Sequence, residues 1–148
     1  MMTDMNSEDL IKKLNNLIEL DYDAIAAYKA AIERLEDTQF KQQLAAFMED
    51  HQNHITALSE SVRLEGGNPA DGGDLKQILT KGKVVVAELG GDDAILKAMK
   101  MNEDVTNKSY EEMVDEPFQG TIKLIVQNGL ADERRHRAWL NATLEQIS

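Results

Sequence analysis

The chain has 148 residues, no cysteine and a formal net charge of −11 at neutral pH. The lack of cysteine excludes disulfides, thiolate zinc sites and cysteine nucleophiles, and the acidic balance argues against nucleic-acid binding, which needs a basic face. No apolar run approaches the roughly 20 residues that span a bilayer, and the acidic start does not resemble a signal peptide. We therefore expect one cytoplasmic domain over residues 1–148, with neither membrane nor nucleic acid as a partner.

Four long segments of helix-forming residues carry apolar side chains at the spacing of an α-helix. Glycine-rich stretches and the two prolines, Pro69 and Pro117, separate them. This pattern predicts helices over residues 7–36, 38–65, 92–115 and 118–147.

The connection between the second and third helices, residues 66–91, is far longer than two antiparallel neighbours need. We expect it to contain a short helix over residues 75–89, with the run Val84-Val85-Val86 as a strand-like exception. Short links elsewhere and one long crossover in the middle indicate an all-α four-helix bundle.

Each predicted helix has an apolar stripe that is interrupted near its middle by residues able to bind a metal. These residues are Asp21 in the first helix, His51 and His54 in the second, Glu103 in the third, and Glu133 and His136 in the fourth. Buried carboxylates and imidazoles are costly unless they are paired or coordinated. Their mixed oxygen and nitrogen donors suit iron or manganese, with zinc as an alternative.

The two halves of the chain repeat this pattern at one offset. Asp21 and Glu103, His51 and Glu133, His54 and His136, and Tyr28 and Tyr110 each lie 82 positions apart. A single offset that superposes every candidate ligand indicates a duplicated helical hairpin.

Two segments resemble the metal motifs of bacterioferritins and rubrerythrins. The segment Leu130-Ala-Asp-Glu-Arg-Arg-His-Arg-Ala-Trp-Leu140 is similar to their last-helix motif, and Asp21-Tyr-Asp-Ala-Ile-Ala-Ala-Tyr28 to their first-helix motif, with Asp21 in place of a glutamate. The whole chain also resembles a group of small bacterial ferritin-like proteins. This resemblance implies a ferritin-like bundle, dioxygen or peroxide chemistry at two irons, and the ligands Asp21, His54, Glu103, Glu133 and His136.

His51 departs from the pattern of these families, where a glutamate at that position bridges both metals. An imidazole cannot bridge through two oxygens, and three carboxylates leave two divalent ions with a net positive charge. A bridging hydroxide, help from Glu49 or Asp50, or a site for a single ion would each resolve this.

The candidate ligands also have simpler interpretations. Asp21 and Glu103 could lie on solvated faces, and His51 and His54 could form a hydrogen-bonded core pair. For Glu133 and His136 the alternative is an exposed pair, but the arginines at 134, 135 and 137 define the solvent side of that helix.

Three other residues have two interpretations each. Tyr28 and Tyr110 are either core aromatics, as we favour, or redox partners, and in both cases their hydroxyls could hydrogen-bond the ligands. Gly129 either leaves room for a small substrate or, as we favour, permits close helix packing.

Two functions of different class follow from the sequence. The first is a metal-dependent oxidoreductase that acts on ferrous iron, peroxide or an organic substrate. The second is a non-catalytic bundle in which a buried polar layer or structural metal fixes the helices and the surface binds a protein. Iron storage is a third candidate, and a homodimer through the outer helix faces is expected.

Overall fold

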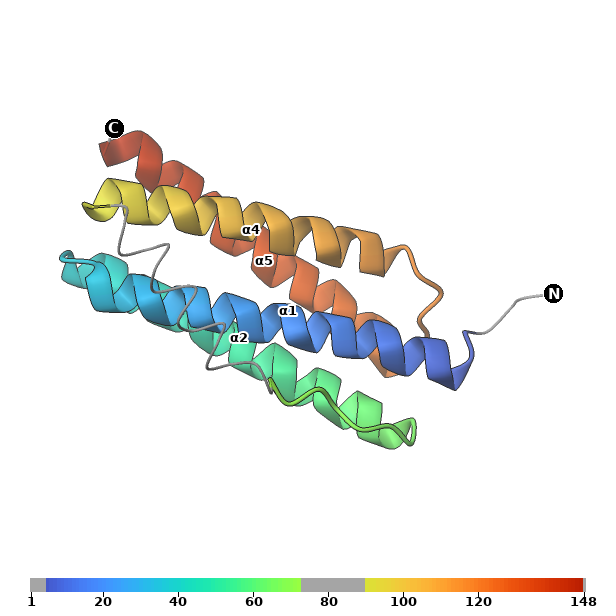
Figure 1. The fold of residues 1–148 in the computed structure, drawn as a ribbon. Coiled ribbons are helices and arrows are strands. Elements are labelled where there is room, and N and C mark those ends of the chain that lie inside the picture. Colours follow the sequence, from blue (N-terminus) through green and yellow to red (C-terminus); the bar gives the residue numbers. More distant parts are fainter. Residues whose placement is uncertain (1–4, 73–89, 148) are drawn as a thin grey trace.

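The computed structural model describes residues 5–72 and 90–147, which form four helices. These are α1 (Ser7–Arg34), α2 (Thr38–Leu64), α4 (Asp92–Val114) and α5 (Gly120–Ile147), shown in Figure 1. The four predicted helices are confirmed, with ends that differ by at most two residues. The predicted short helix over residues 75–89, with its valine run, lies outside the described residues.

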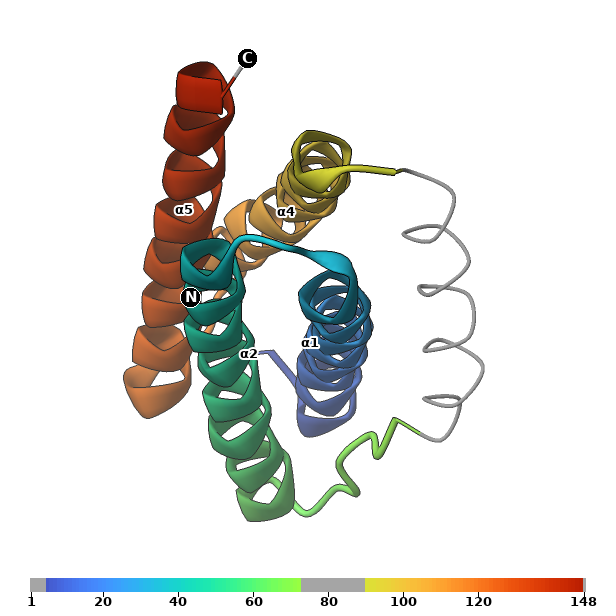
Figure 2. The same ribbon diagram turned by 90° about the vertical axis from the view of Figure 1, so that its left-hand side faces the viewer.

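The helices are arranged as two hairpins. Helix α1 packs most extensively on α2, and α4 on α5. The chain reverses direction within each hairpin, while α2 and α4 run the same way, so the crossover returns the chain to the end at which α2 begins (Figure 1). Figure 2 shows the bundle from the end at which α2 and α4 begin, with α1 seen nearly along its axis and α2 and α5 seen more from the side. The predicted all-α bundle with one long crossover is confirmed. No described helix is long and apolar enough to cross a membrane.

Side-chain caps define where the helices begin. Asn6 accepts a hydrogen bond from the Asp9 amide at 2.8 Å, and Asp37 accepts from the amides of Gln39 and Phe40 in the first turn of α2. The carboxylate of Asp92, at the start of α4, accepts from the amides of Glu36 and Asp37 at 2.9 and 3.0 Å. Asp92 therefore ties the second hairpin to the turn of the first.

The first part of the crossover lies against α1. The side chain of Asn15 donates to the carbonyl of Asn68 at 3.0 Å and accepts from the amide of Ala70 at 2.7 Å. Gly72, in the left-handed region at φ +66°, packs on the ring of Tyr22. These contacts hold the chain on the outer side of α1 as it leaves α2.

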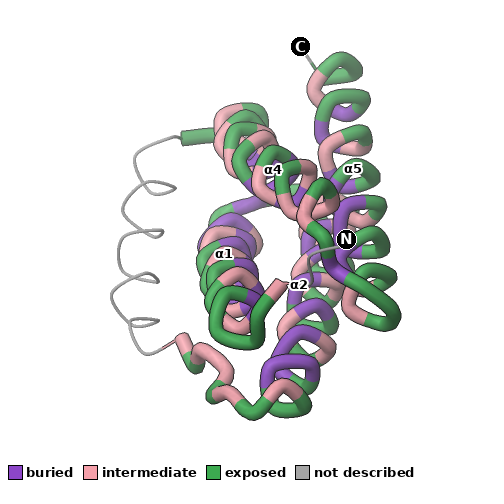
Figure 3. Tube along the Cα trace, turned by 90° about the vertical axis from the view of Figure 1, so that its right-hand side faces the viewer, coloured by how far each residue is buried: buried purple, intermediate pink, exposed green. Residues whose placement is uncertain are grey.

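Two apolar clusters fill the bundle, one on each side of a polar layer. One contains Leu35, Leu44, Leu96 and Leu140, and the other contains Leu14, Leu58, Val126 and Phe118. Buried residues line the inner side of every helix in Figure 3. The residues that interrupt the four stripes therefore lie at one level of the bundle, between two apolar cores.

Candidate metal centre

The six candidate ligands meet in the polar layer. Five of them have no exposed surface and His54 is 8% exposed. Asp21 comes from α1, His51 and His54 from α2, Glu103 from α4, and Glu133 and His136 from α5. All four helices contribute because the turn spacing of each helix places its polar residue on the inward face.

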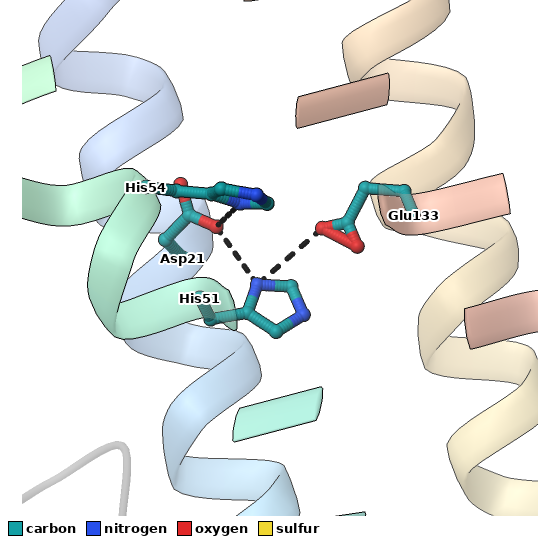
Figure 4. Close-up of side chains that lie close together, drawn as sticks. All are labelled: Asp21, His51, His54 and Glu133. Carbon is teal, nitrogen blue, oxygen red and sulfur yellow. Dashed lines mark hydrogen bonds and ion pairs between the residues drawn. The ribbon is translucent and has the colours of Figure 1, made fainter. Parts of the chain in front are cut away.

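One group of ligand atoms gathers around Asp21. Its Oδ1 lies 2.8 Å from His51 Nδ1 and 3.2 Å from His54 Nδ1. Glu133 Oε1 lies 3.3 Å from the same His51 nitrogen. Figure 4 shows these four side chains converging from three helices. Their ligand atoms all lie within 4.8 Å of one another.

A second group gathers around Glu103. Its Oε1 lies 3.3 Å from His136 Nδ1 and 3.5 Å from His51 Nε2. Glu133 Oε2 is 3.3 Å from His136 Nδ1. This group also fits within 4.8 Å, and it shares His51 and Glu133 with the first.

Several buried atoms of these residues make no hydrogen bond within the described part of the chain. They are His51 Nε2, His136 Nδ1 and both carboxylate oxygens of Glu133. Such atoms are costly in a protein interior unless another partner satisfies them. Imidazole nitrogens and carboxylate oxygens in groups of four are a suitable donor set for iron, manganese or zinc, so the residues fit a metal pair.

Two further aspartates hold the histidines from outside the layer. His136 Nε2 is 2.8 Å from Asp50 Oδ2, and His54 Nε2 is 2.8 Å from Asp132 Oδ2. Because a carboxylate accepts, each Nε2 carries the proton and donates it. The Nδ1 of each ring faces the interior carboxylates, as in metal-binding histidines held by a carboxylate.

Arg135 joins these two aspartates. Its Nη2 donates to Asp50 Oδ2 and Asp132 Oδ1, both at 2.9 Å. The pair Asp50 and Asp132 is again 82 positions apart. A chain of contacts from His136 through Asp50, Arg135 and Asp132 to His54 therefore closes the gap between α2 and α5.

The two tyrosines bind the carboxylates reciprocally. Tyr28 of α1 donates its hydroxyl to Glu103 Oε1 of α4, and Tyr110 of α4 donates to Asp21 Oδ2 of α1 at 2.8 Å. Thr106 donates to the other oxygen of Glu103 at 2.9 Å. The sequence left open whether these hydroxyls bind the candidate ligands, and both of them do.

The charges in the layer shift each other's pKa. Burial raises the pKa of Glu133 to about 7, although His51 and His136 oppose this. Burial also lowers the pKa of His136, but its ion pairs with Glu103 and Glu133 outweigh this effect and raise the value to about 9. The pKa of Glu103 is lowered despite burial, because His136 and His51 lie beside it as ion-pair partners. The charged groups of the layer therefore set each other's protonation.

Asp21 and the histidines of α2 form a second set of coupled charges. Burial raises the pKa of Asp21, but its hydrogen bonds with His51 and His54 lower it below the ordinary value. The pKa of His51 is raised well above the ordinary value, because nearby Glu133 and Asp21 overcome its burial.

Sequence reasoning predicted the six residues that the structure brings together, but it did not predict all of the residues that contact them. Glu49 is exposed, whereas Asp50 reaches His136 and not the ligand atoms themselves. Sequence reasoning did not predict a role for Asp132, and it placed Arg135 only on the solvent side of its helix. The 82-residue offset from Asp50 would have indicated Asp132. Asn107, which donates to the carbonyls of Glu103 and Glu133 at 2.7 and 2.9 Å, was missed as well.

A family model described as "Domain of unknown function (DUF2383)" matches residues 9–116. The chain belongs to this family. The matched region includes α1, α2, the crossover and α4, and with them four of the six candidate ligands. Glu133 and His136, on α5, lie beyond it. No match was found among curated proteins.

Two solved structures share the fold over nearly the whole chain. One is a dodecameric thioferritin, the bacterioferritin-related protein from Bacteroides fragilis, at 15% identity and a TM-score of 0.78, covering 97% of this chain and 88% of that one. The other is a ferritin-like, diiron-carboxylate protein from Bacillus anthracis str. Ames, at 20% identity and a TM-score of 0.73, covering 96% and 99%. The fold of this DUF2383 member is therefore ferritin-like, as the resemblance implied.

Proposed function

We propose that the chain binds two divalent ions, iron or manganese, in the polar layer and uses them in redox chemistry with dioxygen, peroxide or ferrous iron. The observation that carries this proposal is the pair of four-residue groups that share His51 and Glu133. Buried donor atoms without hydrogen bonds lie in both groups. The diiron-carboxylate character of the Bacillus anthracis neighbour supports iron.

The side chains have distinct tasks in this proposal. Asp21 and His54 hold one ion, Glu103 and His136 hold the other, and His51 and Glu133 lie between them. Asp50 and Asp132 fix the histidine rings so that Nδ1 faces inward. When bound, redox-active ions supply electrons to a small oxidant or take them from ferrous iron.

Burial restricts what reaches the layer. Five of the six residues have no exposed surface, so a bulky substrate cannot contact the ions unless helices separate. Dioxygen and hydrogen peroxide are small enough to pass between packed side chains. We therefore favour a small oxidant over an organic substrate.

The test is metal content by mass spectrometry on protein purified without added metal. Glu133→Gln keeps the side-chain shape but removes the charge shared by both groups. Glu60→Gln, on the exposed side of α2, is the matched control. We expect close to two ions per chain in the wild type and the control, and a loss in Glu133→Gln.

Oxygen and peroxide consumption by the ferrous protein then tests the redox step. Saturating Mn²⁺ or Fe²⁺ should also raise the melting temperature, because an ion at 100 times its Kd stabilises the fold by about 2.7 kcal/mol. If no metal binds even after anaerobic ferrous reconstitution, the proposal fails. The layer would then be a structural one in a partner-binding bundle.

A further inference from the structure

The imidazole of His51 lies between the two ligand groups with one ring nitrogen facing each. Its Nδ1 is 2.8 Å from Asp21 Oδ1 in the first group. Its Nε2 is 3.5 Å from Glu103 Oε1 in the second and makes no hydrogen bond with any described residue. In Figure 4 the second nitrogen points away from Asp21 and His54. The ring is fully buried, and the Tyr28 ring packs on it at 5.4 Å between centroids.

Glu133, on the opposite helix, has the same relation to the two groups. Its Oε1 is 3.3 Å from His51 Nδ1, and its Oε2 is 3.3 Å from His136 Nδ1. His51 and Glu133 are the two residues common to both groups, and they occupy equivalent positions in the repeat. Each therefore presents one donor atom to each group.

We infer that His51 bridges the two ions as an imidazolate, through Nδ1 to the ion held by Asp21 and His54 and through Nε2 to the ion held by Glu103 and His136. The inference rests on the proposed metal pair and adds the means by which the ions are joined. Bridging replaces the last ring N–H bond with a second metal–nitrogen bond, and the released proton goes to the solvent. No electrons are exchanged in this step.

Charge supports the imidazolate. The carboxylates of Asp21, Glu103 and Glu133 supply three negative charges against the four positive charges of two divalent ions. A neutral His51 would leave a buried net charge, which is costly in an apolar interior. Asp50 and Asp132 lie outside the ligands and share the positive charge of Arg135. Among the six ligands themselves, an imidazolate supplies the fourth negative charge.

Geometry also disfavours a ring that binds only one ion. In that arrangement the Nε2 hydrogen would have Glu103 Oε1 as its acceptor at 3.5 Å, which is too long for a good hydrogen bond. A buried N–H with so distant an acceptor is unfavourable. The second ion gives Nε2 the partner that the described residues do not.

A zinc-loaded crystal, with anomalous scattering measured at the zinc edge, tests the bridge directly. We expect two zinc peaks about 6 Å apart, with one nitrogen of His51 at about 2.1 Å from each. In His51→Glu, which restores a carboxylate, the peaks should approach to about 3.5–4 Å, as in ordinary two-metal sites. If the wild type instead shows two peaks about 3.5–4 Å apart, with His51 bound to one ion only, the bridge is overturned and the proposed metal pair is left intact.

Copper(II) gives a second test in solution. Two copper spins on one imidazolate couple antiferromagnetically, so the wild type loaded with two coppers should show a reduced paramagnetic resonance signal per copper. The His51→Gln variant at the same copper content should show uncoupled spins. Circular dichroism verifies that this variant is folded. Coupling that persists in His51→Gln, or binding of only one ion, overturns the bridge. Failure to bind zinc, copper, manganese or iron would instead overturn the proposed function itself.

Discussion

The ring of Tyr110 lies directly against Gly129, so that a Cβ built on the glycine would overlap Cε1 of the tyrosine. Tyr110 also donates its hydroxyl to Asp21. The glycine therefore lets the ring lie close enough to α5 for its hydroxyl to reach the carboxylate of α1. Close packing, and not an open space over the site, explains Gly129.

Gly129→Ala should therefore destabilise the protein despite the better helix propensity of alanine. Overpacking costs about 1–3 kcal/mol, and the gain in propensity offsets about 1 kcal/mol of this. Chemical denaturation of the metal-free protein measures the difference. Gly91→Ala is the control, since its Cβ would meet only Asp93 Oδ1 at 3.4 Å. A Gly129→Ala variant as stable as the wild type would show that Tyr110 is free to move away.

Asp50→Asn and Asp132→Asn should each weaken metal binding by about 10- to 100-fold, because an amide orients and polarises a histidine less well than a carboxylate. The first change acts on His136 and the second on His54, so each should affect a different ion. Competition with a chelator measures both affinities. Glu49→Gln, at the exposed neighbour of Asp50, should leave them unchanged. Equal affinities in all three variants would contradict a role for these aspartates.

The metal-free protein should lose stability as the pH rises from about 6.5 to 9. The pKa of His136 is raised from 6.5 to about 9 in the fold, so its contribution is complete below 6.5 and is lost as the pH passes 9. Glu133 has the same sign: its pKa rises from 4.5 to about 7, so its contribution disappears as the pH rises through 7.

Acid should also destabilise this form. The pKa values of Asp21 and Glu103 are lowered, so their contributions are present above the ordinary range and are lost as the pH falls. Melting temperatures in the presence of a chelator should thus peak at mildly acidic pH. Bound metal should flatten the alkaline fall, because ions then replace the protons. A melting temperature that climbs between pH 6.5 and 9 without metal would contradict these shifts.

Asp92→Ala should destabilise the bundle by about 1–2 kcal/mol, since it leaves the amides of Glu36 and Asp37 without their shared acceptor. Asp93→Ala removes an acidic residue from the same first turn of α4 and is the matched control. Thermal unfolding of the two variants separates the loss of these hydrogen bonds from the loss of helix-dipole stabilisation. Equal melting temperatures would mean that the link between the hairpins contributes nothing.

Periodicity predicted the helices and the inward residues because both depend on the spacing within a single helix. The interruption of the stripes at Asp21, His51, Glu103 and Glu133 therefore located the layer correctly. Asp132 and Arg135 were different. Each lies beside the inward stripe of α5, and only the approach of α2 brings His54 and Asp50 within reach.

Other features depend on information that a single chain does not contain. The reciprocal contacts of Tyr28 and Tyr110 follow from how α1 and α4 cross. The expected homodimer, the reaction and the identity of the ions stay predictions. They depend on surfaces and ligands beyond the chain itself.

The repeat of 82 residues has a consequence for how the two ion positions differ. A pair of identical hairpins would have to carry the same residue at every matching position. In one continuous chain the matching positions can carry different residues. Here an aspartate matches a glutamate, a histidine matches a glutamate, and Phe47 matches Gly129. The ring of Phe47 stacks on His136 at 4.2 Å between centroids, whereas His54 has Tyr110 beside it at 5.6 Å. The two groups therefore have different aromatic neighbours, and two ions held there would have unequal affinities and unequal potentials.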